Sequence, residues 1–233
     1  MIEMGRVGIW SGMRSGEPGA VETAAATIEA SGYGALWIPG GAGGDVLDRC
    51  RAALEATTGL VVATGILNVW RHDAGEVAAE TVALRAASGD RFVLGLGVSH
   101  ERLIGEEYVA PLAKMRSYLD ELDAAGQQPG VRLLGALRAR MLELSASRTA
   151  GAHPYFVPPE HTAVAREALG AGSFLGPEQT VVLERDPSAA RELGRQFVSR
   201  YLPLPNYTEN LRQLGYTDDD IEDLAARGVI LDR

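Results

Sequence analysis

Seven short apolar runs alternate along the chain with longer segments of helical pattern, and this alternation restricts the fold more than any other feature. The predicted strands are Arg6–Ser11, Ala35–Ile38, Leu60–Leu67, Phe92–Gly97, Val131–Leu134, Gly151–Phe156 and Thr180–Glu184. The predicted helices are Ala20–Ser31, Val46–Ala56, Gly75–Ala87, Leu112–Ala125, Ala136–Ala146, His161–Leu169 and Pro187–Tyr201. Seven β-then-α units in order predict an α/β fold with a parallel sheet and right-handed crossovers.

Two architectures fit this order, a doubly wound open sheet and a (β/α) barrel. The units recur without a change of composition or a long linker, which favours one continuous domain over residues 1–233. The segment 203–233 then breaks the rhythm. It predicts a proline-stiffened turn and two short helices, an irregular tail of the same domain in which only Gly228–Leu231 resembles an eighth strand.

Charge and cysteine content narrow the class of protein. The formal net charge of −9 argues against nucleic acid or an anionic membrane as the main partner. No apolar run approaches the ~18 residues of a membrane span, and the N-terminus lacks a signal-peptide pattern. Cys50 is the single cysteine, which excludes an internal disulfide and a cysteine-based zinc cluster, and no other metal-ligand spacing is present. We therefore expect a cytoplasmic protein without a metal site.

Two glycine-containing strand ends suggest places where a ligand approaches the backbone. In Val61–Trp70, "VVATGILNVW", Gly65 interrupts an otherwise apolar strand, which is typical of a bulge or of close approach by a ligand. In Leu94–His100, "LGLGVSH", the dinucleotide-binding pattern lacks its third glycine. A strand that ends at a ligand, with Gly97 allowing close approach, fits this segment better.

Other polar residues follow predicted strands. His72, His100 and His153 lie near strand ends, and the carboxyl ends of barrel strands carry the active site, although any one of these histidines could equally be structural. His161 opens a helix and is interpreted as structural. In "LLGALRARMLEL", Gly135 leads a strand into a helix whose N-terminus, with Arg138 beside it, could bind a phosphate. An ordinary turn followed by an exposed arginine is the alternative.

Several blocks in order resemble a known family: "GYGALWIPGG", "VVATGILNVWRHDAGEVAAETVAL", "SGDRFVLGLGVSH", "LLGALRARMLEL" and "AGAHPYFVPPEHTAVAREALG". From about Arg6 to Asp220 the chain is similar to the bacterial luciferase-like superfamily. More specifically, it resembles an actinobacterial branch of oxidoreductases dependent on coenzyme F-420, a deazaflavin. Lys114 is the only lysine beside many arginines, which indicates a high-GC source and agrees with that branch.

The resemblance implies a luciferase-like (β/α)8 TIM-type barrel that lacks the eighth β/α unit, and a homodimer. It also implies hydride transfer between F-420 and a small organic substrate. Two alternatives remain open: a flavin- or deazaflavin-binding protein without catalysis, and an FMN-dependent monooxygenase of the same superfamily.

The resemblance also assigns residues. The third strand of the family carries a bulge with a cis peptide that supports the cofactor ring, and Gly65 and Ile66 match it. The implied cofactor contacts are Gly65, Ile66, Asn68, Gly97, Val98, Gly135, Ala136, Leu137, Arg138, Gly151 and Ala152. His100, His153 and Tyr155 are the candidates for a proton partner of the substrate. Where many members have an acid–histidine pair, this chain has "PGGAGG" after its second strand.

A Cβ at position 65 would, on this interpretation, lie near the cofactor ring. We therefore expect Gly65→Val to fold nearly normally, because valine suits a strand, and to lose cofactor binding. If Gly65 is instead only a loosely packed core glycine, valine would overpack the core, cost about 1–3 kcal/mol in stability and leave the cofactor affinity of the folded molecules unchanged.

Overall fold

The computed structural model describes residues 3–11, 19–40 and 45–227. Its strands are β1 (Gly8–Trp10), β2 (Ala35–Ile38), β3 (Val61–Thr64), β4 (Leu67–Asn68), β5 (Phe92–Gly97), β6 (Arg132–Leu134), β7 (Gly151–Ala152) and β8 (Phe174–Leu175). All pairings are parallel, and the order across the sheet is β1-β2-β3-β5-β6-β7-β8, with β4 beside β5. Strands neighbouring in the chain are thus neighbours in the sheet, which excludes a doubly wound sheet, whose order reverses.

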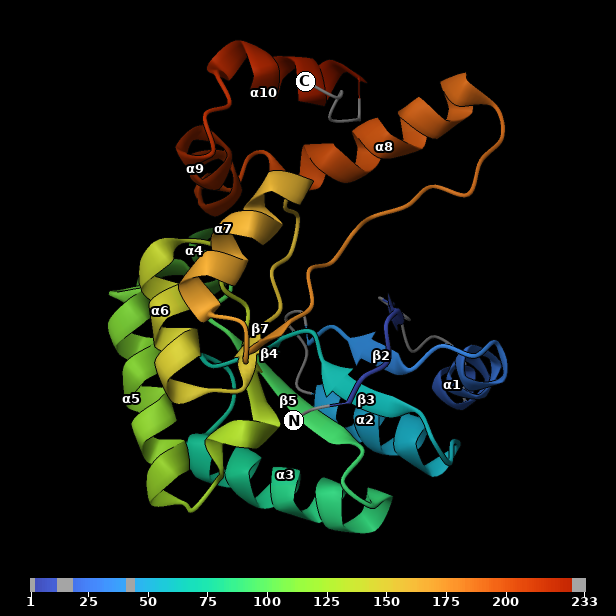
Figure 1. Ribbon diagram of the computed structural model, residues 1–233, viewed down its shortest axis with the longest axis vertical. Helices are drawn as coiled ribbons and strands as arrows, with labels where there is room; N and C mark the ends of the chain where they lie inside the picture. The colour runs from blue at the N-terminus through green and yellow to red at the C-terminus, as the bar shows by residue number, and fades with distance from the viewer. Residues whose placement is uncertain (1–2, 12–18, 41–44, 228–233) are drawn as a thin grey trace.

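Helices lie outside the curved sheet, as Figure 1 shows for α3, α5 and α6. The helices of the β/α units are α1 (Ala20–Ala30), α2 (Val46–Glu55), α3 (Ala74–Ser88), α5 (Pro111–Ala124), α6 (Ala139–Arg148) and α7 (Pro159–Leu169). Three short helices, α4 (Glu101–Ile104), η1 (Gly105–Glu107) and η2 (Pro129–Val131), lie in the connections on either side of α5. The fold is a half-barrel of seven strand positions, and no ladder joins β1 to β8 among the described residues.

The alternation of side chains along the strands builds two apolar layers. On β2, Leu36 and Ile38 join the large core between sheet and helices, whereas Ala35 and Trp37 join a smaller cluster with Ala63 of β3. Successive side chains of a strand point to opposite faces of the sheet, so this smaller cluster fills the concave side. The concave side is therefore packed with side chains, as in a barrel interior.

The predicted third strand, Leu60–Leu67, is divided by a local irregularity. β3 ends at Thr64, β4 begins at Leu67, and the Gly65–Ile66 peptide between them is cis. β3 pairs with the first residues of β5 and β4 with its last ones. The bulge predicted at Gly65 is confirmed.

The predicted strand Thr180–Glu184 is wrong, because the last strand of the sheet is β8, at Phe174–Leu175. Residues 180–184 have no strand partner, and Val181 and Leu183 are 72% and 99% exposed. Strand propensity expresses how a side chain fits a half-buried pleated surface, so β-branched residues alone do not make a strand.

Beyond β8 the chain forms α8 (Pro187–Tyr201), α9 (Pro205–Gln213) and α10 (Asp218–Arg227), and the two short helices predicted for the tail are confirmed. Figure 1 shows the three helices together at one end of the molecule, next to α7. Val198, Leu211, Tyr216 and Leu224 join them in an apolar cluster of their own. The weak strand candidate Gly228–Leu231 lies outside the described residues. Among the described helices, none has both the length and the apolar character that crossing a membrane requires.

Candidate functional site

The parallel strands all end on one side of the half-barrel, here called the carboxyl face. β1 ends at Trp10, β5 at Gly97 and β6 at Leu134, and most of the predicted site residues follow strand ends of this kind. Active sites of (β/α) barrels form at this face because the loops there surround the open end of the barrel.

Ile66 occupies a cradle of glycines on the carboxyl face. A Cβ added at Gly97 would lie 2.6 Å from Ile66 Cγ1, and one at Gly135 would lie 3.3 Å from Ile66 Cγ2. The Ile66 carbonyl accepts the backbone N–H of Gly40 at 3.0 Å, and a Cβ at Gly40 would also collide with this oxygen. Ile66 remains half-buried, so part of its side chain is open to the carboxyl face. Gly97 and Gly135 thus leave room for the Ile66 side chain, and Gly40 leaves room for its carbonyl.

Gly65 faces the opposite way, into the interior. Its carbonyl accepts the indole N–H of Trp10 at 2.9 Å. A Cβ at position 65 would lie 2.9 Å from Trp10 Nε1 and 3.3 Å from Trp37 Cβ. A valine at this position would collide with the Trp10 indole and crowd Trp37, so the expectation that this variant folds nearly normally is wrong.

Asn68 and Val98 support the neighbouring turn. Asn68 is buried, and its Oδ1 accepts the backbone N–H of Trp70 at 3.1 Å. The Val98 carbonyl accepts the indole N–H of Trp70 at 2.7 Å. Both residues lie beside Gly97, since Asn68 pairs with it in the ladder between β4 and β5. They fix the turn next to the Ile66 cradle.

Gly135 to Arg138 lead from β6 into α6. Gly135 N–H donates to Leu96 O at 2.8 Å, and Nε2 of the buried His161 bonds to Leu137 O at 2.6 Å. This agrees with the structural role predicted for His161. Arg138 is the exposed N-cap residue of α6 and makes no capping side-chain bond. The first N–H groups of α6 and the Arg138 guanidinium together form a place suited to an anion.

Gly151 and Ala152 are buried in β7, against β8. Gly151 has φ of +148°, and a Cβ there would collide with Phe174 O, so only glycine fits. His153 follows them and is 3% exposed, with its ring stacked on Trp37 at 4.0 Å. Its Nδ1 lies 2.6 Å from Gly176 O and donates to it, and burial lowers the His153 pKa to about 4. His153 is a neutral interior residue at ordinary pH.

Tyr155 lies in an aromatic cluster over the carboxyl face. Its ring is 5.0 Å from that of Trp10, and its hydroxyl is 2.8 Å from the hydroxyl of Tyr201 on α8. Tyr207 of α9 is 6.4 Å from Tyr155 and 5.6 Å from Tyr201 between ring centroids. Burial raises the pKa values of Tyr155 and Tyr207, so both phenols stay protonated at ordinary pH.

Tyr207 also joins His100 to this cluster, with 5.1 Å between the two ring centroids. Asn206 places its Nδ2 3.5 Å from His100 Nδ1 and accepts from Arg138 at 3.3 Å through Oδ1. Burial lowers the His100 pKa. Of the three predicted proton partners, His100 and Tyr155 therefore meet at Tyr207, whereas His153 lies below them against Trp37. His72 is half-buried in the turn before α3.

Sequence reasoning missed four residues of this face: Trp10, Glu178, Tyr201 and Tyr207. The sequence does not single out Glu178, because it predicts the last strand at 180–184. The observed strand is Phe174–Leu175, which ends three residues before Glu178. Tyr201 and Tyr207 belong to the tail, whose return to the carboxyl face no local pattern indicates.

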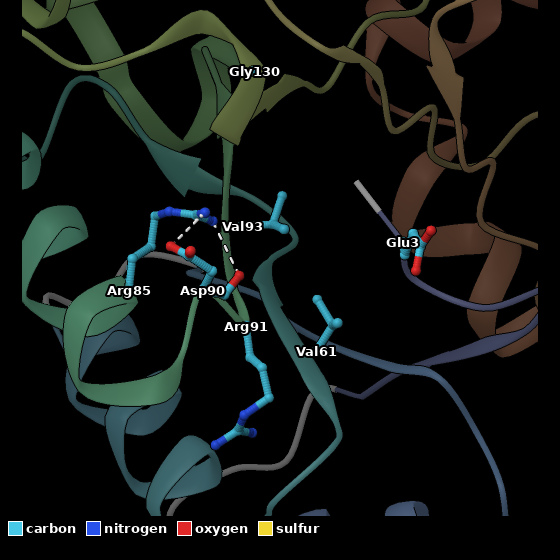
Figure 2. A pocket seen from close by; sticks show the side chains of 7 residues that line it. All are labelled: Glu3, Val61, Arg85, Asp90, Arg91, Val93 and Gly130. Atoms are coloured by element: carbon cyan, nitrogen blue, oxygen red, sulfur yellow. Dashed lines mark hydrogen bonds and ion pairs between the residues drawn. The ribbon is translucent and has the colours of Figure 1, made fainter. Parts of the chain in front are cut away.

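The opposite face of the half-barrel contains a cavity of about 370 Å³, shown in Figure 2. Its charged lining residues include Arg85, whose guanidinium donates to the Asp90 carboxylate and to Phe92 O. Arg91 donates to Thr57 and to the carbonyls of residues that close α2. Both guanidinium groups thus form hydrogen bonds that stabilise the ends of α2 and α3. The face of a barrel opposite the active site is expected to contribute to stability in this way.

Comparison with known proteins relates this geometry to one family. Residues 4–133 match the family model described as luciferase-like monooxygenase. A search of curated proteins gave no match.

Solved structures share the fold at low identity. The coenzyme F420 dependent tetrahydromethanopterin reductase from Methanopyrus kandleri is 13% identical, with a TM-score of 0.70 over 97% of this chain and 82% of that one. An F420-dependent secondary alcohol dehydrogenase in complex with an F420–acetone adduct is 14% identical, with a TM-score of 0.71 over 92% and 83%. The oxygenating constituent of 3,6-diketocamphane monooxygenase from Pseudomonas putida, in complex with FMN, is 12% identical, with a TM-score of 0.66 over 94% and 82%.

Proposed function

The chain belongs to the luciferase-like monooxygenase family, and from this premise we propose that it is an oxidoreductase that binds the deazaflavin F-420 at its carboxyl face. In this proposal it transfers a hydride between F-420 and a small organic substrate. The observation that carries the proposal is the Ile66 cradle. Gly97 and Gly135 leave room for the Ile66 side chain, whose exposed part offers an apolar support for one face of a planar ring system.

The phosphate-bearing tail of the cofactor would lie at the N-terminus of α6. Arg138 and the first N–H groups of that helix suit a phosphate, because the helix dipole and the guanidinium both favour negative charge. Leu137 and Ala136 would then flank the tail, with Gly151 and Ala152 forming the adjoining wall. The bound cofactor supplies the hydride chemistry, and the protein orients it and excludes water.

A titration of the purified protein with F-420 and with FMN tests the proposal, because F-420 binds more tightly if it is the cofactor. Tighter binding of FMN would instead favour the FMN-dependent monooxygenase, the activity class of one structural neighbour. Binding of F-420 without turnover of any substrate would favour the non-catalytic binding protein.

A matched pair of ligands tests the phosphate site. Arg138→Ala should weaken FMN binding about tenfold, since a hydrogen bond to a charged group contributes roughly 1.5 kcal/mol or more. Riboflavin, which lacks the phosphate, should bind both proteins equally. An equal loss for the two ligands would contradict the assignment of Arg138 to the phosphate.

We also expect a homodimer. The resemblance implies pairing through barrel helices, and the outer edges of β1 and β8 have no partner strand among the described residues. Light scattering at micromolar concentration measures this, and a soluble monomer would contradict it.

A further inference from the structure

Glu178 follows β8 and lies on the carboxyl face. Its backbone N–H donates to Pro154 O at 2.8 Å, which fixes the residue beside the β7 connection. Its Oε1 accepts the hydroxyl of Thr180 at 2.8 Å. Oε2 is buried and makes no hydrogen bond of ordinary geometry among the described residues, although the Phe156 backbone is near enough to the carboxyl to favour its charge. Within the described part of the chain no arginine, lysine or histidine pairs with it.

Burial of the Glu178 carboxyl works against its ionisation. Burial raises the pKa of the carboxyl, and the Thr180 hydroxyl and the Phe156 backbone oppose this only in part. The Glu178 charge would in turn raise the pKa values of Tyr155 and Tyr207, so both phenols lie within its electrostatic reach. A carboxyl with a buried free oxygen, set among protonated phenols, can give up a proton to a neighbouring acceptor.

The cluster connects Glu178 with the residues around the Ile66 cradle. Tyr155 contacts Trp10, and Trp10 bonds to the carbonyl of Gly65, the residue before Ile66. Ile66 follows β3 and Glu178 follows β8, so both lie beyond the carboxyl ends of strands, and the Tyr155 ring is 6.4 Å from that of Tyr207 on α9.

We propose that Glu178, with Tyr155 and Tyr207, forms the proton-donating subsite of this face and takes an uncharged substrate that bears a carbonyl oxygen. The proposal rests on the proposed function for its reductant. A bound reduced cofactor would supply a hydride to the carbonyl carbon, and as the C=O π bond opens the oxygen would take the Glu178 proton. The products would be an alcohol, the oxidised cofactor and the Glu178 carboxylate, which would regain a proton from the oxidised cofactor or from solvent.

Glu178, Tyr155 and Tyr207 also indicate which class of substrate this subsite binds. The aromatic rings offer apolar contact, and the phenols and carboxyl offer hydrogen-bond donors. An anionic substrate would meet the Glu178 carboxyl, which pairs with no cationic side chain among the described residues. A neutral ketone fits this chemistry, and the isosteric carboxylate does not.

The protonation state is measured first, on the protein without cofactor. Infrared spectra should contain a protonated-carboxyl band whose titration midpoint lies above the ordinary glutamate value of about 4.3. Glu178→Gln, which has the same shape and cannot ionise, should remove that band. Glu184→Gln, an exposed residue of the same connection, should keep it. A midpoint at or below the ordinary value, or a band that survives Glu178→Gln, would overturn the proposal.

Ligand binding to the same proteins is the second measurement, with acetophenone and benzoate as probes and tryptophan fluorescence as the signal. Acetophenone should bind at least about tenfold more tightly than benzoate. Its affinity for the wild-type protein should fall as Glu178 ionises and stay constant with pH in Glu178→Gln. Equal binding of the two probes, no binding of acetophenone, or a pH-independent wild type would each overturn the proposal.

Reduction is measured last, with the protein loaded with reduced F-420 and with acetophenone as substrate. Glu178→Gln should slow the reaction roughly 100-fold or more at unchanged F-420 affinity, as expected when a positioned acid is lost. An unchanged rate would overturn the proposal. The F-420 titration reports separately on the proposed function, since failure to bind F-420 leaves the infrared and acetophenone results intact.

Discussion

Protonation of His153 should make the fold unstable in mild acid. Nδ1–H donates to Gly176 O, so the proton-free nitrogen is Nε2, which is buried and has no partner in the described part of the chain. Burial lowers the folded-state pKa to about 4, against a reference value of about 6.5 for the unfolded chain. The unfolded state therefore takes up a proton first as the pH falls.

The size of the effect follows from the two pKa values. A difference of about 2.5 pKa units, at 1.36 kcal/mol each, corresponds to about 3 kcal/mol of unfolding free energy. The full contribution is present above about pH 6.5. It is lost progressively as the pH falls to about 4, below which both states hold the proton.

Urea unfolding at pH values between 7 and 4 measures this loss. His153→Asn is the matched control, because the asparagine Nδ2 can still donate to Gly176 O and does not titrate. Other groups that titrate in this range act in both proteins, so the difference between the two curves isolates His153. Parallel curves for wild type and variant would refute the assignment of a buried neutral histidine.

Two further predictions concern packing and buried charge. Gly65→Val should lower the unfolding free energy by about 1–3 kcal/mol in the absence of any cofactor, because its side chain collides with Trp10; an unchanged melting temperature would contradict this. Asp123→Asn should cost about 1–3 kcal/mol, because the Asp123 carboxylate, although 40% exposed, pairs with the fully buried guanidinium of Arg132. Asp120→Asn, on an exposed pair with Arg148, should cost below about 1 kcal/mol. Equal losses of unfolding free energy for the two variants, measured by urea unfolding, would show that burial of the Arg132 guanidinium does not strengthen its pair with Asp123.

The order of strands and helices could be predicted because each unit carries its own signal. Pro187–Tyr201 matches α8 in both bounds, and Ala35–Ile38 matches β2. The last strand could not be predicted, since its two residues, Phe174 and Leu175, are too few to form a pattern. The exposed run at 180–184 has better strand composition, but strands are selected by partners rather than by composition.

The candidate site also has a part that local sequence predicts and a part that it does not. The resemblance identified the irregularity at Gly65–Ile66, because the local sequence there is distinctive. The side chain that a Cβ at Gly65 would meet belongs to Trp10, 55 residues earlier, and no local sequence pattern contains that contact. The meeting of His100 and Tyr155 at Tyr207 likewise depends on how α9 folds back over the strands.

The Ile66 cradle and the aromatic cluster come from different parts of the chain, which has a physical consequence for substrate specificity. Residues 4–133, which match the family model, include Ile66 and Gly97 of the cradle, whereas Tyr155, Glu178 and Tyr207 lie beyond them. Rigid strands position the cradle, and a loop and the tail helices supply the cluster. Binding residues on connections can change while the scaffold remains, because connections carry few packing constraints. Cofactor affinity should therefore depend mainly on the strand glycines, and substrate choice on the chain after β7.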